Sequence, residues 1–409
     1  MTSNPTATRT FSPGKARVAI FMTLFTAGVG NSFVFAVLPA LGRQIGLVEI
    51  QIGSIIAVAA LVFMIAAPIW GHRSEAWGRR PVILFALGAY AITTILFATV
   101  VRFGLNGVLP IMATYILLLL TRSIFTAGIS GLFPCSQAYM ADITTPKERT
   151  SGMALVGMAS GAGMIAGPGF AALFAPYGLI TPFYAVAALA VIAGIFVFRG
   201  IVDVPREQPP EDAVQQSLFN RRLIPFFMLS TTMMTTLSSM QQSTGFYIQD
   251  MFHLSTEQAA QRVGGALMMS ALASVSSQFI FVQRMGWSAR TLLRTGPPIT
   301  ILGILLFATT SNYGVMVASM GVFGIGFGMI MPGVTSSLSM SVSGHEQGRV
   351  AGLNTSAQGM GFIIGPLLGS GLYQIYPRLP YALCVGLLCG SLFLVHHITR
   401  QLKEEGTHT

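Results

Sequence analysis

The most unusual side chain in the sequence is Arg122, which lies within a long apolar stretch that begins near Pro110. An ionisable group inside such a stretch is costly to bury and usually has a function, for example binding an anion. Two other interpretations are open. Arg122 could lie near the end of the stretch, with its charge reaching the polar surface, or it could be a structural arginine bonded to carbonyl oxygens.

Uncharged hydrogen-bonding groups gather in the stretch that begins near Leu223, which contains MLSTTMMTTLSSMQQSTGFY. In an apolar setting these groups must face protein or water, although serine and threonine hydroxyls can also bond to carbonyls of their own helix. The amides are therefore the stronger candidates for binding a ligand. They are Gln241 and Gln242 in this stretch, and Asn31, Gln278, Asn354 and Gln358 in other apolar stretches.

Motifs of enzymes and of nucleotide hydrolysis are missing from the sequence. There is no phosphate loop of the Gly-x4-Gly-Lys-Ser/Thr kind, no His-Glu-x2-His pair and no acidic pair inside an apolar stretch. The cysteines, Cys135, Cys384 and Cys389, lack the spacing of a metal site or of a disulfide framework. We therefore expect no enzymatic activity, no metal, no cofactor and no direct use of ATP.

The elements that position these side chains are predicted to be transmembrane helices. Of 409 residues, 53% are hydrophobic and 9% are charged, with a mean hydropathy of +0.68, which leaves too few charges for a soluble surface of this size. Twelve stretches are long enough to cross a bilayer as helices, and the first runs from about Val18 to Leu41. The others begin near Ile52, Pro81, Pro110, Gly152, Leu179, Leu223, Val263, Thr291, Tyr313, Val350 and Pro380. The predicted fold class is an all-α polytopic membrane protein with twelve transmembrane helices.

The formal net charge of +10 is explained by topology rather than by a nucleic-acid partner. With the N-terminus inside, 18 of the 23 lysines and arginines fall on the cytoplasmic side. Only four fall outside, namely Arg43, Arg102, Arg262 and Arg378. Positively charged loops stay in the cytoplasm, so both termini are predicted to be cytoplasmic and the lipid bilayer is the expected surroundings.

A polar, proline-containing interval from Arg199 to Arg222 separates six apolar stretches from six others. We predict a cytoplasmic tail at 1–17, a six-helix bundle at 18–199, a central cytoplasmic linker at 200–221, a second bundle at 222–400 and a cytoplasmic tail at 401–409. The division is based on the spacing of apolar stretches, and the two bundles are of nearly equal length.

The two bundles also repeat each other in sequence. Pro134 matches Pro332, and Gly163, Gly167 and Pro168 match Gly361, Gly365 and Pro366, all at a separation of 198 residues. Arg149 and Gly152 match Arg349 and Gly352 at a separation of 200 residues. Such a duplication predicts two pseudo-symmetric six-helix bundles that face each other across a central cavity and rock to expose it to alternate sides. Chance similarity between glycine-rich helices is the alternative.

The segment GHRSEAWGRRPVIL, after the second apolar stretch, resembles the loop signature of the major facilitator superfamily. Its glycines are expected to permit a sharp reversal of the chain, and the resemblance implies that its charged residues hold a cytoplasmic gate closed. Glu75 stands where the family usually has aspartate, and Asp142 matches the family's usual partner for the arginines. A solvated basic loop would explain only the arginines. The gate residues are Gly71, Arg73, Glu75, Gly78, Arg79, Arg80 and Asp142.

The fifth apolar stretch carries a ladder of small residues that would let a neighbouring helix approach closely and would end in a proline kink. The ladder consists of Gly157, Gly161, Gly163, Gly167 and Pro168. It is similar to the antiporter motif of the twelve-span drug:proton antiporters, which include the tetracycline exporters. That resemblance implies the major facilitator fold, export of a small-molecule substrate, protons as the coupling ion, a monomer and a bacterial inner membrane.

The chain departs from that family in its charged residues. The acidic position of the first span in tetracycline exporters falls on Ala27, with Asn31 the nearest strongly polar side chain. Arg122 lies close to a conserved-motif arginine of the fourth span in the family, but one extra residue separates it from AGISG. The family also implies that the first, fourth, seventh and tenth spans line the cavity.

Three functional hypotheses remain open at this point. The first is proton-driven efflux of drugs or metabolites. The second is a dedicated exporter of an endogenous anionic metabolite, such as a carboxylate siderophore, with Arg122 as the anion-binding group. A facilitator or importer is the third.

Overall fold

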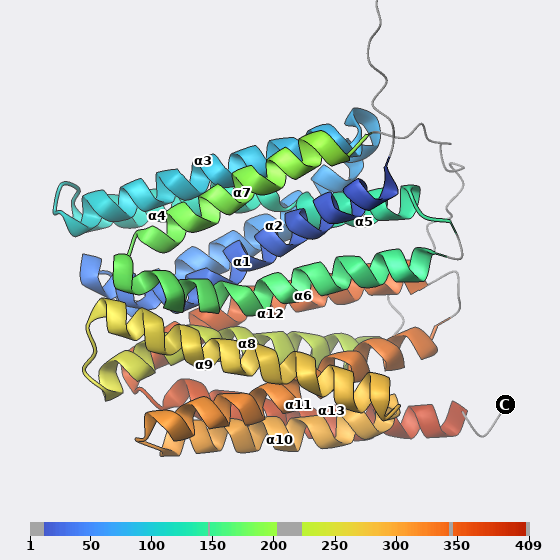
Figure 1. Ribbon diagram of the computed structural model, residues 1–409. Coiled ribbons are helices and arrows are strands. Elements are labelled where there is room, and N and C mark those ends of the chain that lie inside the picture. Colours follow the sequence, from blue (N-terminus) through green and yellow to red (C-terminus); the bar gives the residue numbers. More distant parts are fainter. Residues whose placement is uncertain (1–11, 146–147, 203–222, 343–346, 406–409) are drawn as a thin grey trace, which may run out of the picture.

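The computed structural model describes residues 12–145, 148–202, 223–342 and 347–405, and these residues are helical nearly throughout (Figure 1). Most of the predicted linker and parts of both predicted tails lie outside the described residues. The helices of the first half are α1 (Pro13–Ile45), α2 (Glu49–Trp77), α3 (Arg79–Leu105), α4 (Ile111–Ile129), α5 (Leu132–Asp142), α6 (Arg149–Phe174), the short η1 (Ala175–Tyr177) and α7 (Thr181–Gly200). Those of the second half are α8 (Ile224–Met251), α9 (Thr256–Ser277), the π-helical η3 (Gln278–Arg284), α10 (Ala289–Thr309), α11 (Tyr313–Met340), α12 (Gln347–Ile375) and α13 (Leu379–Glu405).

The predicted twelve-helix fold is confirmed, because α4 continues into α5 and α9 continues into η3 as single membrane-length segments. Within the described residues, ten segments are long and apolar enough to cross a membrane. The other two, α8 and α12, have 28 and 29 residues and are less apolar. These two helices carry four of the six amides singled out by the sequence.

The two halves are built alike around α1 and α8. In the first half α1 packs against α6, and a side chain on Gly163 would collide with the carbonyl oxygen of Phe25. In the second half α8 packs against α12 in the same way, with Gly361 against the backbone of Thr231. In each half, a serine at the corresponding position of the first helix lies close to the carbonyl oxygen of that glycine.

Ser32 of α1 donates a hydrogen bond to its own helix at Gly28 O over 2.9 Å and lies 3.5 Å from Gly163 O of α6. Ser238 of α8 donates to Met234 O over 2.7 Å and to Gly361 O over 3.0 Å. The same packing solution in both halves supports the pseudo-symmetry that the repeat predicts.

The start of α1 and the end of α13 lie at one end of the molecule, at the right of Figure 1. We call this end the termini side and the opposite end the far side. The two halves meet along α2 and α12, α6 and α9, and α1 and α8, and we call this line of contact the seam. Side chains along the termini-side half of α2 are exposed, for example Phe63, Ile65 and Ile69, whereas Ile52, Ile55 and Ile56 near its far end are buried.

Two close backbone approaches of described glycines across the seam lie toward the far side. A β-carbon added at Gly53 of α2 would lie 2.5 Å from Pro366 O of α12. Where α9 crosses α6, a β-carbon added at Gly264 would likewise lie 2.5 Å from Pro168 O. The halves are therefore packed together at the far side.

Two sequence expectations about local structure are corrected. The eighth span was expected to begin near Val263, but α9 begins at Thr256, where Ser255 caps the helix by accepting a hydrogen bond from Gln258 N. Its first turns are helical but polar, so hydropathy does not reveal them. The expected reversal after the second span occurs at Gly78 alone, where φ is 92°, whereas Gly71 lies inside α2.

Candidate functional site

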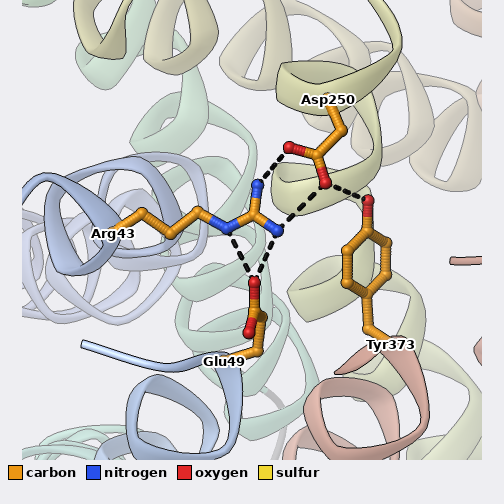
Figure 2. Close-up of polar contacts among 4 residues, drawn as sticks. All are labelled: Arg43, Glu49, Asp250 and Tyr373. Carbon is orange, nitrogen blue, oxygen red and sulfur yellow. Dashed lines mark hydrogen bonds and ion pairs between the residues drawn. The ribbon is translucent and has the colours of Figure 1, made fainter. Parts of the chain in front are cut away.

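Four side chains form an ion cluster at the far end of the seam, Arg43, Glu49, Asp250 and Tyr373 (Figure 2). Arg43 comes from the end of α1 and Glu49 from the start of α2, so both belong to the first half. Asp250 comes from the end of α8 and Tyr373 from α12, so both belong to the second half. We call these four residues the far-side cluster, and it joins the two halves.

The guanidinium of Arg43 is shared between two carboxylates. Its Nε and Nη2 donate to Glu49 Oε1 over 3.0 and 2.6 Å. Its Nη1 and Nη2 donate to Asp250 Oδ1 and Oδ2 over 2.5 and 3.0 Å, a two-point contact that fits the planar shape of both groups. Tyr373 Oη donates to Asp250 Oδ2 over 2.7 Å. Arg43 and Asp250 thus each have one partner in their own half and one across the seam, whereas Glu49 is bonded to Arg43 of its own half.

Aromatic rings enclose the same guanidinium. Arg43 Cζ lies 4.8 Å from the ring centre of Phe246 and 5.5 Å from that of Tyr373, within range of a cation–π attraction. The Arg43 side chain is 19% exposed and that of Asp250 is 47% exposed. The pair is therefore partly open to solvent, which is typical of a contact that can be broken and reformed.

The amides predicted on α1 and α8 lie just below the far-side contact of these helices. Pro39 of α1 packs against Gly245 of α8, so closely that a β-carbon on Gly245 would lie 2.6 Å from Pro39 Cγ. Gln241 lies one turn from Gly245 toward the termini side and is partly exposed. Asn31 lies two turns from Pro39 in the same direction and is exposed, although most of α1 is buried. Both amides therefore occupy the side of their helix that faces the seam.

Gln242 is buried, unlike the adjacent Gln241. It is 0% exposed, and neither its amide oxygen nor its amide nitrogen has a hydrogen-bond partner in the structure. Gln241 Oε1 also lacks a partner, but the residue itself is partly exposed.

The remaining predicted amides differ in their contacts and exposure. Asn354 is buried and accepts a 2.5 Å hydrogen bond from Ser230 of α8, which ties α8 to α12. Gln358 lies one turn farther along α12 and is partly exposed. Gln278 is also partly exposed and begins the π-helical segment η3. The structure thus gives Asn354 a packing partner and does not bring Gln278 to the α1–α8 contact.

Arg122 lies inside the first half, not at the seam. It is 7% exposed, and its Cζ lies 4.4 Å from the ring centre of Phe125. It borders a cavity of about 10 Å³ that is also lined by Phe33, Thr93, Thr94, Phe97, Phe125 and Phe183. This volume is sufficient for about one water molecule. No ion pair of the Arg122 guanidinium occurs among the described residues.

Two basic residues of the predicted gate, Arg79 and Arg80, fasten helices of the first half to one another, whereas Arg73 contacts its own helix. Arg79 is 7% exposed, donates to Ser74 Oγ, and its Nε lies 3.6 Å from Asp142 Oδ2. Arg80 Nη2 donates to Phe198 O over 3.0 Å. Arg73 stacks over Trp77, with 5.0 Å between Cζ and the ring centre. The side chain of Glu75 lies outside the described residues.

The glycine ladder is used for packing at only part of its length. Gly163 and Gly167 lie against the backbone of α1, and Pro168 lies at the α9 crossing. Gly157 and Gly161 have open space where a β-carbon would be, so the expectation that they allow close helix approach is wrong. They lie on an exposed or partly exposed face of α6, whereas Val156 and Ala159 of the same stretch are buried.

Sequence reasoning missed the far-side cluster. Arg43 was counted only as one of four basic residues outside, and Glu49, Asp250 and Tyr373 were not singled out. The available signal was the position of Arg43 and Asp250 at the far ends of corresponding helices, α1 and α8. No group of three or more His, Cys, Asp or Glu side chains among the described residues could hold a metal ion.

Comparison with known proteins gives consistent results. A sequence model of the Major Facilitator Superfamily matches residues 20–296 and 280–407. Multidrug resistance protein 1 of Bacillus subtilis (strain 168) is 25% identical over 372 residues, covering 88% of this chain and 90% of that protein. The quinolone resistance protein NorA of Staphylococcus aureus (strain MSSA476) is 24% identical over 384 residues, covering 92% and 94%.

Among solved structures, a bacterial homologue of the human lysosomal transporter Spinster, in an inward-facing and occupied conformation, superimposes with a TM-score of 0.77. It is 13% identical, and the match covers 98% of each chain. At this identity the match shows the fold alone.

Proposed function

The chain belongs to the major facilitator superfamily of secondary transporters, and we propose that it exports a small organic molecule in exchange for protons. The observation that carries the proposal is the arrangement of α1 and α8. Their halves are packed together at the far side, and the amides of Asn31 and Gln241 lie just below that contact. Membership of this family makes the protein a multi-pass membrane transporter and not an enzyme.

The proposed orientation places the termini side in the cytoplasm of a bacterial inner membrane. The distribution of lysine and arginine supports this orientation, since basic loops remain cytoplasmic. The far side is then the outer side. The far-side cluster would close the protein to the outside. The exposed side chain of Asn31, in the middle of α1, would border a path open to the cytoplasm. A molecule could then enter from the cytoplasm and meet Asn31 and Gln241.

A drug-like molecule is the substrate class that we favour. The two amides offer uncharged hydrogen bonds, which do not require a charged substrate. Similar proteins are named for multidrug and quinolone resistance. Proton coupling is proposed from the resemblance to drug:proton antiporters.

A second candidate is export of an anionic metabolite through Arg122. The observation in its favour is a buried guanidinium without an ion-pair partner among the described residues. Against it stands the size of the adjoining cavity, which has room for about one water rather than a carboxylate metabolite. Binding there would require the helices of the first half to separate.

The test uses the purified protein in proteoliposomes that contain a trapped pH dye. Norfloxacin, tetraphenylphosphonium and citrate are added in turn, and substrate-evoked proton movement is measured. We expect norfloxacin or tetraphenylphosphonium to move protons and citrate to move none, with Arg122→Gln retaining activity within about threefold. Proton movement with citrate alone, abolished by Arg122→Gln, would overturn drug export and support the anion exporter.

A further inference from the structure

Gln242 has a fully buried amide with no hydrogen-bond partner in the part of the chain that the structure describes. Both polar atoms of its amide lack partners, and the side chain is 0% exposed. Leaving such groups unpaired away from water is unfavourable, so a buried polar group without a partner requires an explanation. A leucine, which is similar in volume, would fill most of the same space without this cost.

The position of Gln242 on α8 suggests where its missing partner comes from. Gln242 lies three residues from Ser239, whose side chain packs on Gly369 of α12, and three residues from Gly245, which packs on Pro39 of α1. Residues three apart lie on the same side of a helix. Gln242 therefore faces the far part of the seam, between a helix of its own half and one of the other half.

Two further features place Gln242 beneath the closed contact. Phe246 lies one turn toward the far side, and its ring carries the Arg43 guanidinium of the far-side cluster. Ser370 of α12, whose Oγ is also buried without a partner, faces Gly53 of α2 across the same part of the seam. Separation of the halves at the far side would expose both unpaired groups.

Gln241 differs from Gln242 in its exposure. Successive residues of an α-helix point about 100° apart. Gln241 is therefore partly exposed although the adjacent Gln242 is buried. In the present conformation Gln241 is partly accessible, although its Oε1 is buried, whereas Gln242 is inaccessible. After opening of the far side, Gln242 becomes accessible as well.

We propose that Gln241 and Gln242 are a pair of hydrogen-bonding sites used in two different conformations. Gln241 binds an uncharged polar group of the exported molecule, such as a carbonyl or hydroxyl, while the termini side is open. Gln242 takes over that group once the far side opens. The inference rests on the proposed export function. It assigns Gln241 to the conformation that is open at the termini side and Gln242 to the conformation that is open at the far side.

The first test does not depend on transport. Gln242→Leu removes an unpaired buried amide, so we expect the melting temperature of the detergent-purified protein to rise by about 2 °C or more. Gln241→Leu is the comparison variant: it removes one buried unpaired oxygen from a partly exposed residue, so we expect a smaller rise, below about 1 °C. A fall in melting temperature for Gln242→Leu would show that this amide has a structural partner, and would overturn the inference.

The second test measures sidedness in vesicles of known orientation. Norfloxacin carries carbonyl groups, whereas tetraphenylphosphonium has no hydrogen-bonding group and serves as the control probe. Gln241→Leu should weaken the apparent affinity for norfloxacin about fivefold from the termini side, the value of one lost hydrogen bond. Gln242→Leu should do so from the far side. Neither variant should change the affinity for tetraphenylphosphonium.

The outcomes separate the two proposals. If the wild-type protein moves neither norfloxacin nor tetraphenylphosphonium, the proposed drug export is wrong and the two-site inference falls with it. If the wild type transports norfloxacin and the two variants lose affinity equally from both sides, export stands and the division of roles between Gln241 and Gln242 is wrong.

Discussion

Charged side chains at the two ends of the molecule make different kinds of contact. On the far side, Arg43 of the first half is bonded to Asp250 of the second half. On the termini side, the ion pairs among the described residues, Arg79 with Asp142 and Arg17 with Glu148, each join two segments of the first half. Charges on the far side therefore hold the halves together, whereas those on the termini side hold one half together.

This difference shows how one side can close reversibly. The far-side pair is partly exposed, and each charge has a second partner in its own half, Glu49 for Arg43 and Tyr373 for Asp250. Breaking the contact across the seam consequently leaves neither charge without a hydrogen bond. A buried pair without such substitutes would be far costlier to separate.

Replacing Arg43 by glutamine should disturb the far side most strongly. Glu49 and Asp250 would then face each other without the cation between them, and like charges repel. Truncating a buried interfacial charge pair costs about 2–5 kcal/mol. Because this pair is partly exposed, we expect about 1.4 kcal/mol, which is a tenfold shift toward the open far side.

Cross-linking of a cysteine pair across the seam measures that shift. A β-carbon on Gly371 would lie 3.4 Å from Ile50 Cδ1, so Ile50→Cys with Gly371→Cys reports closure of the far side. The exposed native Cys389 is changed to serine in the background, since Cys135 and Cys384 are buried. An unchanged cross-linking rate in Arg43→Gln would show that helix packing alone closes the far side.

A comparison of Asp250→Asn with Glu49→Gln sharpens the same point. Both variants remove one negative charge from the same guanidinium, but only Asp250 lies across the seam. We expect Asp250→Asn to lower far-side cross-linking about threefold to fivefold, within the range for a charged hydrogen bond at a partly exposed site. Glu49→Gln should lower it by less than about 1.5-fold, because Arg43 keeps Asp250. Equal effects of the two variants would mean that the total charge of the cluster matters and the crossing of the seam does not.

Much of the fold is predictable from the sequence because it depends on local patterns. Long apolar stretches must form helices in a bilayer, and the repeated prolines and glycines mark equivalent packing positions. Gly163 and Gly361 do lie at corresponding helix contacts. The pairing of Arg79 with Asp142 was also suggested by the family resemblance.

The conformation could not be predicted in this way. Whether Gly157 packs against a helix or faces open space depends on how far the helices diverge, and no local pattern encodes that distance. The same holds for Arg43 and Asp250, which are 207 residues apart and meet only because the far side is closed. Arg122 shows the same limit, since its unusual sequence context suggested a ligand site and, in this conformation, its cavity has room for about one water.

The smallest effect on far-side closure is expected from Asp142→Asn. The Arg79–Asp142 contact lies at the opposite end from the far-side cluster and within one half, so its loss should change far-side cross-linking by less than about 1.5-fold, as expected for a distant site. The same variant should still lower the melting temperature by about 2 °C, because the Arg79 side chain is only 9% exposed and loses a charged partner. Loss of stability without loss of closure would establish that the two ends are fastened independently. If Asp142→Asn instead reduced far-side cross-linking as much as Asp250→Asn, the charges at the two ends would be coupled through the first half, and the contrast between them would be wrong.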